Sequence, residues 1–343
     1  MIVLKESLSH LKPYATLKRN EGIKLDSNEG ENYLLPEGIT LDLPFERYPE
    51  NHADALKEAI AKVHGVNPSQ LLTGNGSSEI LEWVIKSVIG KGETILTVDP
   101  TFVMYKFYAT IHECDYVSVP LSDDFSFPLD AFLSALEKTK PKLIILCSPN
   151  NPTGGLIDPD VIKSIIQKAP GLVVLDEAYI EFAQEQPTFI HEVESYPNLL
   201  ITRTFSKAYG LASIRLGYAV GSKALIEQLT LTKTPYNVNA LSQTIGQEVI
   251  QQQAKVSDYV TRVIKRRDSL KKDLERYGYH VFASAANFLF MREPFDGFTA
   301  LIKDKGILIR PFALNENYVR ISIGSEPDIN AFKKAIKEIN DDL

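Results

Sequence analysis

A lysine at position 207 stands in an unusual local setting. It follows Ser206 in the segment Thr204–Arg215, shortly after the apolar run Leu199–Ile201, which indicates a buried strand. A surface lysine needs no such setting, whereas a lysine that attacks a carbonyl must be desolvated so that its amine is unprotonated. Ser206 and Arg215 have side chains that can hold a phosphate. The segment therefore predicts a Schiff-base lysine beside an anion site.

Polar side chains also follow two other apolar runs. Asp176 and Tyr179 come just after the run Leu172–Leu175, and Asn151 follows the run Leu143–Cys147. In open α/β sheets, ligands bind beyond the carboxyl ends of the strands. We therefore expect these side chains and Lys207 to meet at one edge of a sheet.

A second candidate anion site precedes a predicted helix. The segment Thr73–Glu79 is rich in small residues, and apolar residues at helical spacing follow it over 80–89. Small residues let the backbone approach a phosphate, and the N-terminus of a helix favours an anion. Ser77 and Ser78 are the candidate donors. Alone, the segment is equally well explained as an ordinary turn.

Together these residues match the parts of pyridoxal phosphate (PLP). A buried carboxylate such as Asp176 would keep the pyridine nitrogen protonated, and Asn151 and Tyr179 are suitable donors for the ring oxygen. Phe102, just after another apolar run, could stack on the flat ring. Alone, Asp176 is more simply a turn residue and Phe102 a core residue. Their joint occurrence with Lys207 favours the cofactor.

The elements that must position these groups alternate along the chain. From about Tyr48 to Thr234, helical patterns alternate with runs that are apolar on both faces, which is typical of a sheet covered by helices. From about Val256 a charged helix follows, then short strands that begin near Val281, and a final helix. We predict an α/β fold with a mostly parallel sheet between helices and a smaller α+β domain. The predicted divisions are an N-terminal segment joining the small domain (1–45), a large PLP-binding domain (46–245) and a small C-terminal domain (246–343).

Composition excludes several classes of protein. The chain has 343 residues and a formal net charge of −7, which argues against nucleic-acid binding. Two cysteines exclude a disulfide framework and fit a reducing cytoplasm. No apolar run is long enough for a membrane span, and Met1–Glu6 shows no apolar leader. Scattered histidines predict no metal site.

The order of the motifs resembles the fold-type-I, aspartate-aminotransferase-like PLP enzymes. Within them the chain is most similar to the histidinol-phosphate aminotransferases. The resemblance runs nearly end to end, through segments 11–14, 47–49, 74–79, 148–154, 176–179, 204–207, 235–237 and 320–324 and through Arg215 and Arg310. Two departures stand out. The family usually carries Asn-Glu-Asn-Pro where this chain has Asn28–Glu31, and a ring-stacking Tyr where it has Phe102.

The resemblance implies roles for individual residues. Lys207 would be the Schiff-base lysine and general base, with Asp176 and Tyr179 assisting it. The cofactor would be held by Ser77, Ser78, Phe102, Asn151, Asp176, Tyr179, Ser206 and Arg215. Tyr48 would reach the cofactor phosphate of a neighbouring subunit, which implies a homodimer. Substrate phosphate or carboxylate would be bound by Tyr14, Arg310 and Arg320, with Asn237 in the site wall.

The implied reaction is ping-pong transamination between histidinol phosphate and 2-oxoglutarate, in histidine biosynthesis. Two alternatives keep the fold: a threonine-phosphate decarboxylase, favoured by the altered loop at Asn28–Glu31, and an aromatic amino-acid aminotransferase, because Arg320 suits a carboxylate equally well. From other classes, a PLP-binding regulator without turnover would carry an added DNA-binding domain, and a nucleotide-binding protein would use the loop at Gly74–Glu79.

Overall fold

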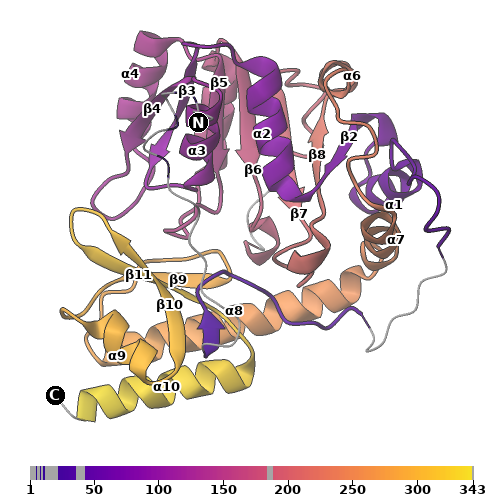
Figure 1. Ribbon diagram of the computed structural model, residues 1–343. Helices are drawn as coiled ribbons and strands as arrows, with labels where there is room; N and C mark the ends of the chain where they lie inside the picture. Colours follow the sequence, from indigo (N-terminus) through magenta and orange to yellow (C-terminus); the bar gives the residue numbers. More distant parts are fainter. Residues whose placement is uncertain are drawn as a thin grey trace.

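Two β-sheets organise the structure, a computed structural model that describes residues 5, 8, 11, 22–35, 43–183 and 188–341. The larger sheet, with its helices, occupies the upper half of Figure 1, and the smaller sheet lies below it. A strand from the N-terminal segment lies beside strands from the C-terminal part of the chain (Figure 1). An early strand and three strands from the last quarter of the chain therefore share the smaller sheet.

The larger sheet contains seven strands among the described residues. These are β2 (Leu71–Gly74), β3 (Thr94–Asp99), β4 (Asp115–Pro120), β5 (Leu143–Cys147), β6 (Leu172–Asp176), β7 (Leu199–Thr204) and β8 (Gly217–Gly221). Their spatial order is β2-β8-β7-β6-β5-β3-β4. β8 is antiparallel to both of its neighbours, and the other pairs are parallel. The predicted, mostly parallel sheet is confirmed.

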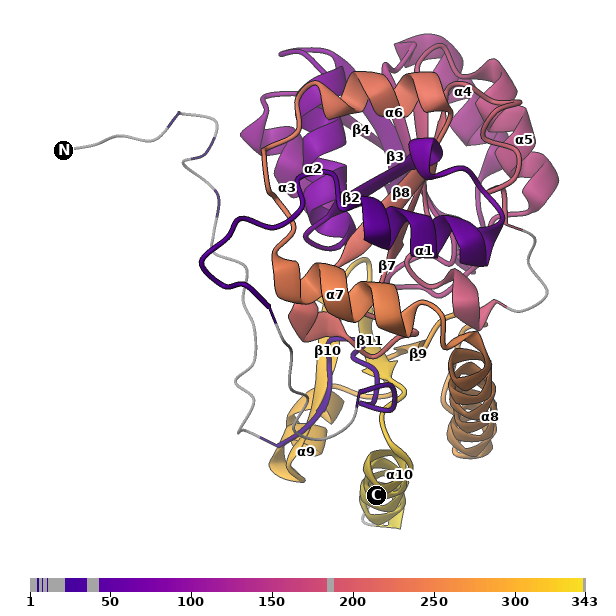
Figure 2. The same cartoon turned by 90° about the vertical axis from the view of Figure 1, so that its right-hand side faces the viewer.

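Helices cover both faces of this sheet because its central strands are apolar on both faces. In β5, Ile144 and Leu146 belong to one buried cluster, while Ile145 and Cys147 belong to another. The first cluster is covered by α1 (Asp54–His64), α4 (Leu129–Thr139), α5 (Pro159–Lys168) and α7 (Ala240–Val249), the second by α2 (Gly76–Val88), α3 (Met104–Ile111) and α6 (Lys223–Thr230). Figure 2 shows α1 and α7 packed side by side.

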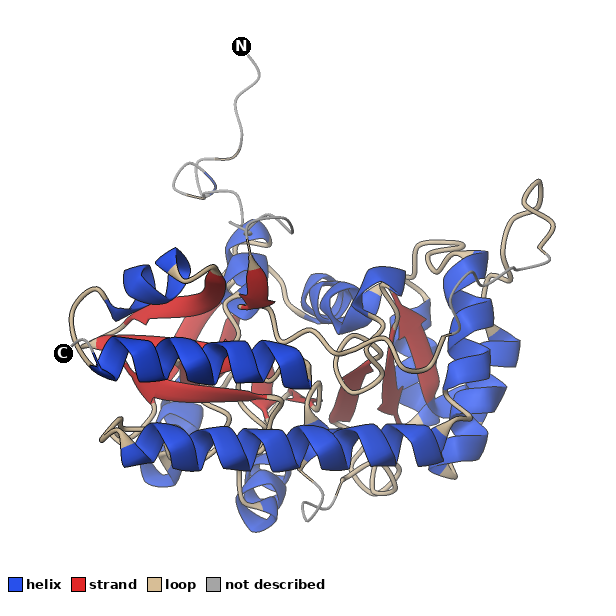
Figure 3. Ribbon diagram, turned by 90° about the horizontal axis from the view of Figure 1, so that it is seen from below, coloured by secondary structure: helices blue, strands red, loops and turns tan. Residues whose placement is uncertain are grey.

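The smaller sheet has the order β1-β10-β11-β9. Its strands are β1 (Ile23–Leu25), β9 (Phe288–Arg292), β10 (Ile307–Ala313) and β11 (Asn317–Ser322). The accompanying helices are α8 (Gln253–Arg276), α9 (Phe298–Asp304) and α10 (Glu326–Asp341). Seen from below, α8 and α10 run along the same side of this sheet (Figure 3). The predicted mixed α+β part is thus confirmed, and β1 ties the N-terminal segment to it through parallel pairing with β10.

Short 3-10 turns connect several elements, at η3 (Pro68–Gln70), η4 (Ile180–Phe182) and η5 (Ala212–Ile214). One strand expected near Val281 is absent as a strand: Val281 forms only an isolated bridge to Met291. The Ser284 hydroxyl donates to the Phe288 carbonyl across the loop that leads into β9.

Candidate active site

A pocket opens at the carboxyl ends of β5, β6 and β7, as the strand order requires. Its lining residues come from the N-terminal segment, the larger sheet and β11. They are Ser27, Asn28, Ser77, Ser78, Phe102, Cys147, Asn151, Asp176, Ala178, Tyr179, Thr204, Ser206, Lys207, Arg215 and Arg320. Residues that lie far apart in the sequence thus surround one space.

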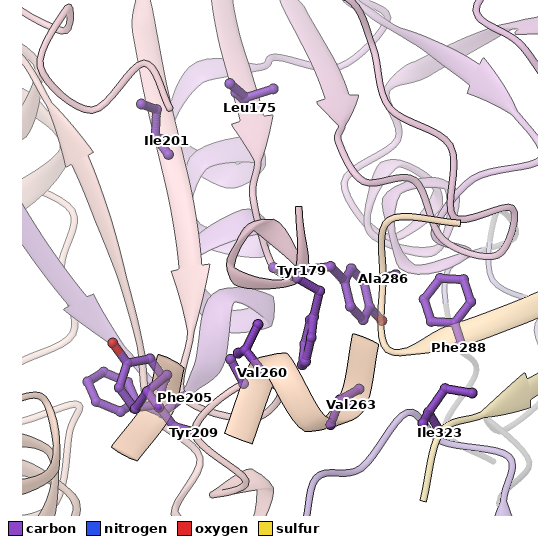
Figure 4. Packing of buried hydrophobic residues seen from close by; sticks show 14 of the residues in the cluster. Leu175, Tyr179, Ile201, Phe205, Tyr209, Val260, Val263, Ala286, Phe288 and Ile323 are labelled. Carbon is purple, nitrogen blue, oxygen red and sulfur yellow. The ribbon is translucent and has the colours of Figure 1, made fainter. Parts of the chain in front are cut away.

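Lys207 lies in the turn that follows β7, and its ammonium Nζ donates a hydrogen bond to the Ser27 carbonyl at 3.1 Å. Burial lowers the pKa of this amine to about 7, and the nearby guanidinium of Arg320 contributes in the same direction. Phe205 and Tyr209, which flank this turn, belong with Tyr179 to the buried cluster between the strand ends and α8 (Figure 4). A substantial fraction of the amine is therefore neutral near pH 7, as a nucleophile requires.

Asp176 ends β6 and is buried, with 3% of its surface exposed. Its carboxylate accepts hydrogen bonds from the Tyr105 hydroxyl at 2.7 Å, the Thr202 hydroxyl at 3.1 Å and the Ala178 amide at 3.2 Å. Burial raises the pKa of this carboxyl, while the three donors lower it. A cationic ring nitrogen in the pocket would offset the burial of the charge.

Asn151 and Tyr179 stand together on one wall. The Asn151 amide donates to the Tyr179 hydroxyl at 3.4 Å, and its carbonyl oxygen accepts from Arg320. Burial raises the pKa of Tyr179 to about 12, so the phenol keeps its proton at neutral pH. The pair places an amide and a phenol where a ring oxygen of a ligand would need donors.

The phosphate end is built by close backbone approach. The N-terminus of α2 carries Ser77 and Ser78 beside Arg215, whose Nη1 donates to the Ser206 hydroxyl at 3.4 Å. A Cβ on Gly76, where φ is +74°, would lie 2.7 Å from the Arg215 Nη2, and one on Gly217 would lie 2.4 Å from the Ser77 nitrogen. Glycine at both positions lets the helix end and the guanidinium converge on one anion.

Phe102 lines the pocket and meets the ring of Tyr105 edge-on, with centroids 5.5 Å apart. Its ring is therefore held in one orientation by a buried neighbour. That position suits a side chain that stacks on a flat cofactor.

Four other residues chosen from the sequence lie elsewhere. Tyr48 is 82% exposed and stacks on Tyr236. Asn237 donates to the Thr73 carbonyl and to Glu79, so it supports the phosphate loop and does not line the pocket. Arg310, on β10, pairs in register with Arg320 and is also outside the lining. Tyr14 lies outside the described residues.

Sequence reasoning missed three residues of the site. Tyr105 is fully buried, and of the three hydrogen bonds to the Asp176 carboxylate the one from its hydroxyl is the shortest. Thr202, on β7, is the second side-chain donor. Asn28 contacts Tyr179 from the N-terminal segment. Of these three residues, only Thr202 had a signal in the sequence, because it lies two residues before the end of the strand that leads to Lys207.

Comparison with known proteins places this arrangement in a family. The family model "Aminotransferase class I and II" matches residues 32–339. The chain belongs to this family. It is 35% identical over 349 residues to a histidinol-phosphate aminotransferase of Caldanaerobacter subterraneus subsp. tengcongensis, covering 98% of each chain.

Two solved structures share the aminotransferase fold. A histidinol-phosphate aminotransferase from Sinorhizobium meliloti in complex with pyridoxal-5'-phosphate has a TM-score of 0.85 at 24% identity, over 94% of this chain and 91% of that one. An L-threonine-O-3-phosphate decarboxylase from Porphyromonas gingivalis has a TM-score of 0.73 at 26% identity, over 85% and 92%.

The residues of the pocket in this aminotransferase fit PLP. A lysine with a lowered pKa, a buried carboxylate and an amide–phenol pair are the groups that its carbonyl, ring nitrogen and ring oxygen need. The glycine-lined cradle beside Arg215 has the donors that a phosphate needs. Among residues 22–35, 43–183 and 188–341, no helix is long and apolar enough to cross a membrane. The same described part holds no group of three or more His, Cys, Asp or Glu that could bind a metal.

Proposed function

We propose that the chain is a PLP-dependent aminotransferase that exchanges an amino group between histidinol phosphate and 2-oxoglutarate in histidine biosynthesis. The observation that carries this proposal is the pocket's lysine of lowered pKa facing a buried aspartate, in a chain that matches a protein of that name over 98% of its length. Membership of the family indicates the reaction class, and the pocket contains the residues that we assign to the reaction.

Each residue has a task in this scheme. Bound PLP supplies an electron sink for the charge left at the substrate Cα when a proton leaves. Lys207 would take up and return that proton at its Nζ, because its amine can be neutral near pH 7. Asp176 keeps the ring nitrogen protonated, and Arg215 with Ser206 anchors the phosphate.

Arg320 is the candidate for the substrate carboxylate. It is 8% exposed, and its guanidinium is held by the Asn151 side chain and by the Asp26 carbonyl at 2.7 Å. A guanidinium fixed at the pocket wall pairs with a carboxylate in a defined geometry. Tyr14 and Arg310 remain the candidates for the phosphate of the amine substrate.

We also propose a homodimer that works in the cytoplasm. Phe45 is 74% exposed and Tyr48 is 82% exposed, so both aromatic side chains are available for a partner. A second hollow on that surface, lined in part by Phe45 and Leu241, also reaches Arg215, which lines the catalytic pocket. A partner seated there would bring its own residues close to the phosphate end. Both described cysteines are free, which fits a reducing compartment.

A panel of half-reactions tests the activity. The purified yellow enzyme is mixed separately with histidinol phosphate, phosphothreonine, phenylalanine and glutamate, and the absorbance change to the pyridoxamine form is followed. We expect rapid conversion with histidinol phosphate and glutamate. Conversion with phenylalanine alone would instead favour an aromatic aminotransferase.

The decarboxylase is the second candidate, because a protein of that name shares the fold at 26% identity. Incubation with phosphothreonine distinguishes it. Release of carbon dioxide without amino transfer, together with no reaction with histidinol phosphate, would replace the aminotransferase proposal.

A further inference from the structure

Asn28 lies where the N-terminal segment, the large sheet and the small sheet meet. Its side chain is buried, with 1% exposed, and its φ of +54° is a left-handed conformation that Asn tolerates better than most residues. The backbone amide donates to the Ser322 hydroxyl at 2.7 Å, and the backbone carbonyl accepts from the Asn287 side chain at 3.2 Å. Both backbone groups are thus held by the small domain.

These contacts orient the side-chain amide of Asn28. The Ser322 hydroxyl already accepts the Asn28 backbone amide, so its own hydrogen is available for the Asn28 Oδ1, 3.0 Å away. The Nδ2 group then faces the opposite way, and it donates to the Tyr179 hydroxyl at 3.1 Å.

A second amide donates to the same phenol. The Asn151 Oδ1 accepts from Arg320, which has only donors, so the Asn151 Nδ2 must face Tyr179. The phenol oxygen therefore accepts two hydrogen bonds. With its acceptor positions used, the hydroxyl hydrogen is left to point into the pocket.

We propose that Asn28 is a positioning residue that makes the Tyr179 phenol a hydrogen-bond donor to the ring oxygen of the cofactor. This inference rests on the proposed PLP chemistry. Because Asn28 is held by Ser322 and Asn287, the direction of the Tyr179 hydrogen depends on the contact between the two domains. The motif Asn28–Glu31, which departs from the family pattern, thus keeps a side chain that donates to the phenol.

The substitution Asn28→Asp tests the proposal, since a carboxylate accepts hydrogen bonds and would draw the Tyr179 hydrogen away from the cofactor. A hydrogen bond to the ring oxygen stabilises its anionic form. Its loss should raise, by about one pH unit, the midpoint at which the visible absorbance of bound PLP changes, a tenfold shift in that equilibrium. Asn28→Gly, which also accepts a positive φ, should give a smaller rise, because the Asn151 donor remains.

A double-mutant cycle with Tyr179→Phe separates positioning from general structural damage. Without the phenol, Asn28→Asp should no longer move the midpoint. The matched control is Asn198→Asp, which removes a half-buried amide donor to the Ile166 carbonyl away from the pocket. This control should leave the midpoint unchanged.

The outcomes are distinguishable from failure of the proposed function. A wild-type protein that never becomes yellow with PLP would overturn both proposals. If the wild type becomes yellow, and both Asn28→Asp and Asn28→Gly have the same midpoint as the wild type, only the role of Asn28 is overturned. A shift that persists at full size in the Tyr179→Phe background would do the same.

Discussion

At the scale of single residues, burial changes which groups can react. Lys207 loses hydration beside Arg320 and Arg215, and its pKa falls to about 7. Burial raises the pKa of the Asp176 carboxyl, while three hydrogen-bond donors favour its charged form. The same burial that disfavours charge on the lysine thus requires donors around the aspartate. The two groups together suit a cofactor that is electrophilic at one end and cationic at the other.

The lowered pKa of Lys207 predicts how the stability of the cofactor-free protein depends on pH. Between about pH 7 and the ordinary lysine value of 10.5, the unfolded chain binds a proton here that the folded chain does not. The free energy of unfolding should therefore rise with pH across this window, by about 1.4 kcal/mol for each unit of difference between the two pKa values. Lys207→Met should flatten the rise. Denaturant titrations of both cofactor-free proteins measure it, and parallel curves would contradict the lowered pKa.

At the scale of elements, the site depends on how closely α2 approaches β8. Gly217 begins β8, and a Cβ there would lie 2.4 Å from the Ser77 nitrogen and 2.5 Å from the Gly76 carbonyl carbon. Real side chains do not reach such distances, so the helix end would have to move. The phosphate cradle therefore requires that one strand residue has no side chain.

Gly217→Ala should weaken cofactor binding and stability together. Displacement of α2 should lower PLP affinity about tenfold, the loss of one good hydrogen bond to the phosphate, and cost about 1–3 kcal/mol of unfolding free energy. The control is Gly155→Ala, whose Cβ would meet nothing closer than 3.7 Å. Fluorescence titration with PLP and denaturant unfolding measure the two effects. Equal behaviour of both variants would show that the close approach is unimportant.

At the scale of the whole molecule, one pocket depends on three distant parts of the chain. Ser27 comes from the N-terminal segment, Lys207 from the large sheet and Arg320 from the small sheet. The segment that follows β1 lies directly against the lysine turn: a Cβ on Gly30 would lie 2.7 Å from the Lys207 carbonyl oxygen. Tyr33 adds a hydrogen bond to the Ala208 carbonyl at 2.7 Å. Relative movement of the two domains would therefore change the site itself.

Mixing one weakened and one inactive variant tests whether a partner subunit completes this pocket. Tyr48→Ala should lower PLP affinity, and Lys207→Ala should abolish turnover. If Tyr48 serves the neighbouring subunit, a mixed dimer contains one site with both native residues, and refolding the two variants together should restore activity. Light scattering on the native protein checks the dimer. Absence of recovery despite formation of mixed dimers would place Tyr48 outside the site.

The sequence predicted the central sheet well but its edges poorly. The runs that became β5, β6 and β7 are apolar on both faces. Strands covered by helices on both faces need such runs, so the pattern is easy to recognise. β2 is short, and β4 lies at the sheet edge with only one buried residue, so neither produced a comparable signal. The domain boundaries at 45/46 and 245/246 stay predictions.

The sequence by itself determined which polar groups would lie at the strand ends. Lys207, Asp176, Asn151 and Tyr179 follow apolar runs, and parallel strands bring their carboxyl ends to one edge whatever the loops do. Only the tertiary structure decided which other side chains form hydrogen bonds with them. Tyr105 and Asn28 have no local signal, because their contacts to Asp176 and Tyr179 join segments 71 and 151 residues apart. The position of Lys207 after a buried strand indicated its burial, but the contribution of Arg320, from the other sheet, to its lowered pKa has no local pattern.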